Sequence, residues 1–175
     1  MAITIISLIF VFIILFWQIS LIVAIVHGAP SIYAKRKVII KAFESVGLKN
    51  GQIVADLGCG NARSLVIAAK KFGAKGIGIE ISPFYYLLAK VNVLASGESR
   101  NIKIHFGDFR KRKNLVQKAD LVFLYLFDKV IGKTEPWIFK STRPSAKIIS
   151  LAFPFKNHQA DIVKTSPPIF IYKSN

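Results

Sequence analysis

Acidic residues stand at or just after the ends of successive predicted strands, and glycines stand beside the first of them. A predicted buried strand over residues 53–57 carries Asp56, and Gly58 and Gly60 follow it at G-x-G spacing before a helix. A second predicted strand ends at Glu80, and a third is followed by Asp108. Parallel strands end at the same edge of a sheet, where nucleotide-like cofactors are held. The spacing therefore predicts one binding site at this edge.

The residues after the glycines favour a cationic ligand. A dinucleotide loop uses G-x-G-x-x-G to cradle a pyrophosphate, whereas Asn61, Ala62 and Arg63 follow Gly60 here. The Asp56 carboxylate at the turn would repel phosphate and attract a cation. S-adenosylmethionine (SAM), which carries an ammonium and a sulfonium, fits this requirement, and we expect it to be the cofactor.

Each acidic residue is expected to contact a different part of SAM. Gly58 and Gly60 let the backbone pass close to the cofactor, and Glu80 is placed to accept hydrogen bonds from both ribose hydroxyls. Asp108 would accept from the adenine amino group, with Phe109 against the ring. The predicted cofactor-binding residues are Asp56, Gly58, Gly60, Asn61, Glu80, Ile81, Asp108 and Phe109.

Strands and helices alternate along the rest of the chain. The apolar runs predict strands at 53–57, 76–80, 102–106, 120–126, 146–153 and 169–173, and helices at 62–72, 83–96 and 131–141. Ser82 and Pro83 are a typical helix start, with serine as N-cap and proline in the first turn. Gly76 and Gly78 lie within a strand, where we expect them to allow close packing. The alternation predicts a doubly wound, Rossmann-like α/β fold.

The motif around Gly58 and Gly60, together with Glu80 and Asp108, resembles the successive motifs of class I SAM-dependent methyltransferases. The resemblance covers about residues 38–173, with Ala62 in place of the usual third glycine. It implies a seven-stranded sheet, with the C-terminal strands abbreviated because only twenty residues follow Phe155.

A narrower resemblance concerns the small membrane-anchored protein-lysine methyltransferases. It is carried by an apolar N-terminal helix, Gly28-Ala29-Pro30, Ile81-Ser82-Pro83-Phe84, and Ala152-Phe153-Pro154-Phe155 on the fifth strand. Eukaryotic members of that family modify the mitochondrial ADP/ATP carrier and the c-subunit of ATP synthase, and prokaryotic relatives share the architecture. The resemblance implies methyl transfer to a lysine amine, in a prokaryotic-type member.

The N-terminal segment predicts a membrane anchor. The first 34 residues contain no charged side chain, and Ala2 to Val26 would form a helix of about 37 Å, enough for a hydrocarbon core of about 30 Å. A signal peptide would have a basic start and a shorter apolar run, and a buried core helix this long could hardly be covered by the rest of the chain. Lys35, Arg36 and Lys37 follow the segment, which places the C-terminal domain in the cytoplasm.

These features divide the chain into three parts and suggest its partners. We expect a single-pass transmembrane anchor over 1–27, a linker and basic amphipathic helix over 28–50, and a SAM-binding methyltransferase domain over 51–175. The net charge of +16 lies entirely after the anchor and would be attracted to anionic headgroups. Nucleic acid could use the same charge, but no recognised nucleic-acid motif is present, so we expect none as partner; a merely solvated basic surface is the remaining alternative.

Cysteine chemistry is excluded by the composition. Cys59 is the one cysteine in the sequence, so neither a disulfide framework nor a cysteine zinc site is expected, and we predict no metal. Its place between Gly58 and Gly60 indicates a small packed residue, because a nucleophile would need a partner that stabilises the thiolate.

The exit of the predicted fourth strand is where a methyl acceptor would enter. A lysine acceptor has a pKa near 10.4 and must lose its proton first, which an apolar or aromatic channel would favour. We expect Tyr125 and Phe127 to form the channel wall and Asp128 to orient the amine. The segment lacks the Asn/Asp-Pro-Pro-aromatic motif of enzymes that methylate DNA bases.

The acceptor itself stays open at this point. A neighbouring membrane protein is the first expectation, and a lipid headgroup or quinone-like molecule is the alternative. A non-enzymatic protein that keeps the fold for cofactor sensing or as a scaffold is a third.

Overall fold

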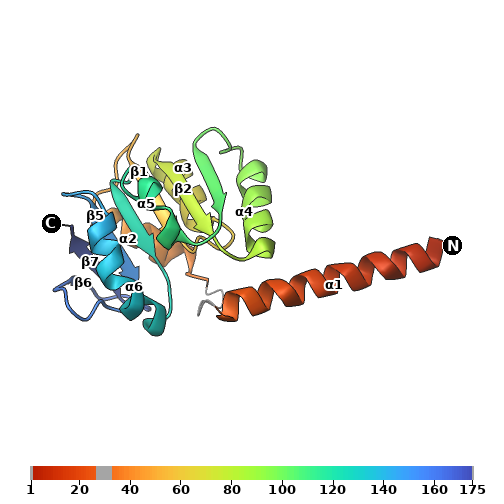
Figure 1. The fold of residues 1–175 in the computed structure, drawn as a ribbon. Coiled ribbons are helices and arrows are strands. Elements are labelled where there is room, and N and C mark those ends of the chain that lie inside the picture. Colours follow the sequence, from red (N-terminus) through yellow and green to blue (C-terminus); the bar gives the residue numbers. More distant parts are fainter. Residues whose placement is uncertain (1, 27–32, 175) are drawn as a thin grey trace.

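Seven strands form one mixed sheet in the order β3-β2-β1-β4-β5-β7-β6 (Figure 1). The computed structural model describes residues 2–26 and 33–174. The first five strands are parallel, and β7 runs antiparallel to both β5 and β6. The strands are β1 Ile53–Leu57, β2 Lys75–Glu80, β3 Ile102–Phe106, β4 Leu121–Leu124, β5 Lys147–Leu151, β6 Asp161–Val163 and β7 Ile169–Lys173. The predicted seven-stranded Rossmann-like fold is confirmed, and β6 is the abbreviated strand.

Helices cover both faces of the sheet, as strands buried on two sides require. Buried residues of α2, α3 and α4 pack on one face, and those of α5 and α6 pack on the other. The helices are α1 Ala2–Val26, α2 Arg36–Ser45, α3 Arg63–Phe72, α4 Pro83–Ala95, α5 Lys113–Val116 and α6 Asp128–Ser141, with a short 3-10 turn at Phe109–Lys111. The carboxyl ends of β1, β2 and β4 remain open between these layers, which is where the predicted site residues converge.

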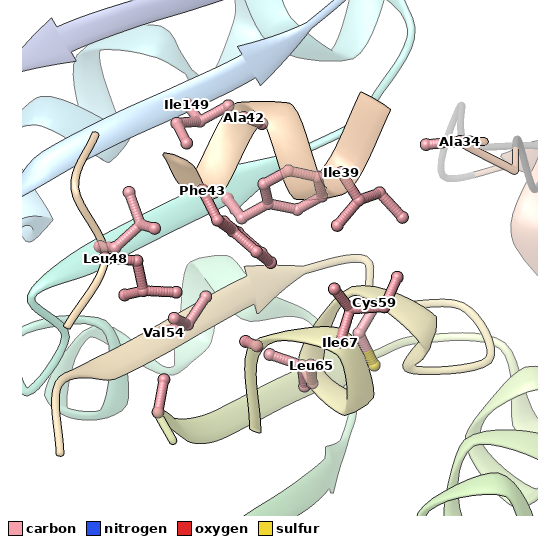
Figure 2. Close-up of a cluster of buried hydrophobic side chains, with 14 of the residues drawn as sticks. Ala34, Ile39, Ala42, Phe43, Leu48, Val54, Cys59, Leu65, Ile67 and Ile149 are labelled. Carbon is pink, nitrogen blue, oxygen red and sulfur yellow. The ribbon is translucent and has the colours of Figure 1, made fainter. Parts of the chain in front are cut away.

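Helix α2 belongs to the core of the α/β domain. Its buried residues lie on one face of the helix, as expected for an amphipathic helix, and are Val38, Ile39, Ala42 and Phe43. Figure 2 shows Phe43 between α2 and the strand that carries Val54, and its ring centroid lies 5.4 Å from that of Phe123 on β4. Helix α2 therefore packs in the same hydrophobic core as residues that follow the expected boundary at residue 50. The turn at 27–31, including Gly28-Ala29-Pro30, lies outside the described residues.

The elements that follow β4 differ from the sequence prediction. Strand β4 ends at Leu124, and α6 begins at Asp128, three residues before the predicted start. The Phe127 carbonyl accepts from the N–H groups of Val130 and Ile131, and an acidic residue in the first turn stabilises a helix. Strand β5 ends at Leu151, so Ala152–Phe155 follow the strand and are not part of it.

Helix α1 projects away from the sheet (Figure 1). Its window Ile3–Ser20 has a mean hydropathy of 2.5, and 6% of that window is buried. By length and composition this helix could span a membrane, although a signal sequence near the N-terminus would meet the same criterion. Its low burial distinguishes it from the core helices, because the α/β domain does not cover it.

Candidate active site

A pocket opens at the carboxyl ends of the parallel strands and encloses about 1020 Å³ together with the open solvent at its mouth. Such clefts, with a few convergent polar groups, are typical ligand sites. All the residues predicted to bind the cofactor line it. They are Asp56, Gly58, Gly60, Asn61, Glu80, Ile81, Asp108 and Phe109. Their individual contacts with a cofactor remain predictions, but their convergence in one cavity is a property of the fold.

The glycine turn follows β1 and forms the floor of this pocket. Gly58 has a φ of +81°, and a Cβ there would lie 3.0 Å from Cδ2 of Leu126. The N–H groups of Gly58 and Cys59 both donate to the Ile79 carbonyl, at 2.9 and 3.2 Å. The turn is thus fixed to β2 and requires glycine for both its conformation and its clearance.

Asp56 supplies a buried carboxylate beneath the turn. Its side chain accepts a hydrogen bond from the Ser64 hydroxyl at the start of α3. Burial, assisted by the nearby Glu80 charge, raises the pKa of Asp56 to about 7, against the opposing effect of the Ser64 hydrogen bond. A cation in the pocket would favour the ionised form, so this residue is suited to a positively charged ligand.

Glu80 ends β2 and is held by backbone amides on both sides. Its Oε2 accepts from the Gly60 N–H and its Oε1 from the Ser82 N–H, both at 2.8 Å. Burial raises the pKa of Glu80, while the hydrogen bonds from the Ser82, Gly60 and Ile81 amides act in the opposite direction. The carboxylate is therefore fixed in orientation at the pocket wall, as recognition of a pair of hydroxyls requires.

Asp108 and Phe109 follow β3 and begin the 3-10 turn. An Asp108 oxygen accepts from the Arg110 N–H at 2.9 Å, and the Arg110 guanidinium lies 2.7 Å from the other carboxylate oxygen. The Phe109 ring centroid is 5.6 Å from that of Trp137. Asp108 is thus paired with Arg110, which also lines the pocket; its contact with adenine stays a prediction.

The predicted acceptor residues separate into two groups. Tyr125 lines the pocket, whereas Phe127 and Asp128 do not. Phe127 packs near Phe153, with ring centroids 6.2 Å apart, and Asp128 is exposed in the first turn of α6. Because α6 begins at Asp128, the part of the wall expected for Phe127 and Asp128 is formed by Leu126, Val130 and Thr134.

Part of the pocket wall comes from the segment between α1 and α2, whose residues were not predicted to belong to the site. Tyr33 and Ala34 line the pocket. The Tyr33 ring lies 6.4 Å from the Tyr85 ring and 5.9 Å from the Arg63 guanidinium. Partial burial and the hydrogen bond with Tyr85 raise the pKa of Tyr33 to about 12, so its hydroxyl stays protonated. These contacts join segments that are far apart in the chain, so no local sequence pattern predicts them.

Helix α1 contacts the catalytic domain through Ser20. The buried Ser20 hydroxyl lies 2.6 Å from the Ser82 hydroxyl and accepts from the Phe84 N–H at 3.0 Å. Ser82 is the N-cap residue of α4, as predicted, but its own side chain makes no capping hydrogen bond. Ser20 therefore caps α4 from another helix. Because the Ser82 N–H also donates to Glu80, two hydrogen bonds in succession link helix α1 to a residue that lines the pocket.

Cys59 is a packed side chain, in agreement with its predicted role. It is buried, and burial beside Asp56 and Glu80 raises the pKa of its thiol. Gly78 makes room for it, because a Cβ at Gly78 would lie 2.8 Å from the Cys59 sulfur. The prediction that the strand glycines serve packing is thereby confirmed for Gly78.

Comparison with known proteins agrees with this geometry. The ANTKMT methyltransferase domain matches residues 56–162. A protein-lysine N-methyltransferase of Saccharolobus islandicus strain REY15A is 28% identical over 129 residues, which are 73% of this chain and 79% of that protein.

Among solved structures, an RNA methyltransferase from Salinibacter ruber in complex with S-adenosyl-L-homocysteine has a TM-score of 0.78 at 25% identity, covering 82% of this chain and 94% of its own. A SAM-dependent methyltransferase from Thiobacillus denitrificans with the same ligand has a TM-score of 0.60 at 24% identity, covering 74% of this chain and 54% of its own.

Proposed function

This chain belongs to the ANTKMT methyltransferase domain family, and on that premise we propose that it is a membrane-anchored protein-lysine N-methyltransferase. It is a SAM-dependent methyltransferase, and its cofactor is SAM. The observation that carries the proposal is the family match from Asp56 to Ile162, which includes every predicted cofactor residue. The Saccharolobus islandicus relative, a protein-lysine N-methyltransferase, supports lysine as the acceptor.

The pocket residues fit SAM by their chemistry. The buried Asp56 carboxylate, whose pKa burial raises, would be stabilised by the ammonium of the cofactor. Glu80, fixed by the Gly60 and Ser82 amides, would accept from the ribose hydroxyls. When bound, SAM supplies an electrophilic methyl group on its sulfonium. The residues of this chain then have to position the acceptor in line and exclude water.

The acceptor side of the pocket suits a neutral amine. Leu126 and Val130 are apolar, and Tyr125 adds an aromatic side chain to the same wall. A lysine amine enclosed by these residues would lose hydration, which lowers its pKa from about 10.4 and favours the reactive neutral form. We propose that desolvation by this wall, rather than a single basic side chain, prepares the nucleophile.

The membrane location of the acceptor is proposed from α1. A 25-residue apolar helix, almost entirely exposed, is stabilised when a bilayer covers it. An enzyme held in the bilayer meets acceptors in the same membrane at high effective concentration. Lys35, Arg36 and Lys37 follow α1 closely, which supports a cytoplasmic catalytic domain and contact with anionic headgroups. The substrate class that follows is a lysine of a membrane or membrane-associated protein.

Two other acceptors are compatible with particular observations. A lipid headgroup or quinone-like molecule would use the same anchor. RNA is a candidate because the Salinibacter ruber protein is an RNA methyltransferase and this chain carries a net charge of +16. The exposed apolar helix α1 favours the membrane protein over RNA.

Methyl-group labelling distinguishes these acceptors. Membranes and cytosolic RNA from a strain that lacks this protein would be incubated with tritiated SAM and the full chain, and then separated into protein, lipid and RNA. We expect label in protein from the membrane fraction, and none with Glu80→Ala enzyme. Label confined to lipid or to RNA would contradict the lysine proposal and select the corresponding alternative.

A further inference from the structure

Exposed apolar side chains of the catalytic domain gather on helix α4. Outside α1, seven large apolar side chains are exposed among the described residues, and four of them lie on this helix. Phe106, on the adjacent edge strand β3, is a fifth, and its ring lies 5.4 Å from that of Tyr86. Single exposed apolar residues are ordinary, whereas a contiguous group indicates a contact surface. The four residues on α4 are Leu87, Leu88, Val91 and Leu94.

The spacing of these residues makes a stripe along α4. Leu87, Val91 and Leu94 stand at i, i+4 and i+7 and are 51%, 62% and 72% exposed. The opposite side of the helix, with Ala89 and Val93, is buried against the sheet. Lys90 is the one charged residue within the helix and is exposed beside the stripe. An apolar face with a flanking cation is typical of a helix that lies in the plane of a membrane interface.

The contact through Ser20 places α4 at a defined height on α1. The hydrogen bond from the Phe84 N–H to the Ser20 hydroxyl fixes the first turn of α4 beside Ser20. From Ala2 to Ser20, α1 is about 28 Å long, close to a hydrocarbon thickness of about 30 Å. If these residues cross the bilayer, its cytoplasmic surface lies at Ser20, which is the level of the α4 N-terminus.

The direction of α4 agrees with this level. Figure 1 shows α4 on the side of the domain toward which α1 projects, running across the direction of α1 and not alongside it. Aromatic residues are frequent at membrane surfaces, and Trp17, Tyr85 and Tyr86 stand in the adjoining turns of the two helices.

We propose that the stripe of Leu87, Val91 and Leu94, with Leu88 and Phe106, lies in the interface of the bilayer that α1 spans. The inference rests on the proposed membrane anchoring. Two attachments, one spanning and one in the plane, prevent the domain from rotating freely about α1. Ile81 precedes α4 and Tyr33 follows α1, and both line the pocket. The arrangement therefore holds the pocket beside the membrane surface, where it selects acceptor lysines close to the headgroups.

Site-directed spin labelling of the full chain tests this placement. Cys59→Ala removes the native thiol, and Val91→Cys or Leu94→Cys provides the labelling position. Ile162→Cys is the matched control, because Ile162 is 60% exposed on β6, at the opposite edge of the sheet. Each labelled chain would be incorporated into vesicles of phosphatidylcholine and phosphatidylglycerol. The relaxation of its nitroxide would then be measured in the presence of oxygen and, separately, of a water-soluble nickel chelate. Flotation of the vesicles checks that α1 is inserted, and SAM binding checks the fold.

If α4 contacts the membrane, nitroxides at the two edges of the sheet should differ in their accessibility to oxygen and to the nickel chelate. The nitroxides at 91 and 94 are expected to collide more with oxygen than with the nickel chelate, and the nitroxide at 162 the reverse. Equal access of the chelate to all three positions in chains that float would overturn the inference and leave the anchor intact. Spin–spin broadening that disappears on dilution with unlabelled chain would assign the stripe to a second copy instead. Failure to float would overturn both the anchor and the inference.

Discussion

The buried carboxylate of Asp56 should make the ligand-free protein less stable than it could be. Its pKa is about 7 in the folded protein against an ordinary value of 3.8, so the folded state binds this proton more tightly than the unfolded chain. The contribution of Asp56 to the free energy of unfolding therefore falls as pH rises from about 4 to about 7, and it stays low above that range. The difference is worth about 4 kcal/mol.

The variant Asp56→Asn removes this ionisation and keeps the size of the side chain. The amide oxygen can still accept from the Ser64 hydroxyl, so we expect the ligand-free variant to be about 2–4 kcal/mol more stable at pH 8. Near pH 3, below both pKa values, Asp56 is protonated in both states and the two proteins should differ little. Loss of the charged partner should weaken SAM binding by about 1.5–3 kcal/mol.

Urea unfolding of the full chain in detergent micelles measures both effects. Trp137 is a suitable fluorescent reporter, because its partly buried ring packs near Phe109 against the hydrophobic core of the domain. Titration of SAM by calorimetry gives the affinity. A variant that is no more stable at pH 8, with a pH profile parallel to that of the unaltered chain, would refute the reasoning about Asp56.

Three further changes test other parts of the site. Glu80→Ala should weaken SAM binding by about 1.5–3 kcal/mol, and unchanged affinity by calorimetry would remove Glu80 from the site. Ser20→Ala should cost about 1 kcal/mol in urea unfolding, because the Phe84 N–H loses its cap, whereas the exposed control Ser7→Ala should cost less; equal costs would contradict a capping role. Gly78→Ala should destabilise the domain by about 1–3 kcal/mol, since its Cβ would lie 2.7 Å from Cδ1 of Ile104. An unchanged thermal unfolding temperature would show that Ile104 and Cys59 can move aside without cost.

The cofactor side of the site was predictable because its signals are local. Asp56, Glu80 and Asp108 each stand within two residues of the end of an apolar strand, and parallel strands bring their carboxyl ends to one edge. The glycines between them have conformations that few other residues adopt, so their positions indicate the turn directly. The fold followed from the same alternation, apart from β6 and α5, whose three and four residues are too few for a periodic pattern.

The acceptor side was less predictable because its residues depend on where elements end. Phe127 and Asp128 were expected to continue the channel from β4, but the strand stops at Leu124 and the first turn of α6 turns both residues away from the pocket. Boundaries of this kind shift by a few residues without any change in composition. Tyr33 lines the pocket beside Arg63 and Tyr85, and Ser20 contacts the start of α4; no short window of sequence contains these tertiary contacts.

The most direct test of the lysine-methyltransferase account is the chemical identity of the labelled residue. Protein from the membrane fraction, methylated in vitro with isotopically labelled SAM by the full chain, would be digested and analysed by mass spectrometry. The account predicts the label on the side-chain nitrogen of a lysine near a membrane-spanning segment, absent when Glu80→Ala enzyme is used. Label on another amino acid, or on lipid or RNA with none on protein, would contradict it.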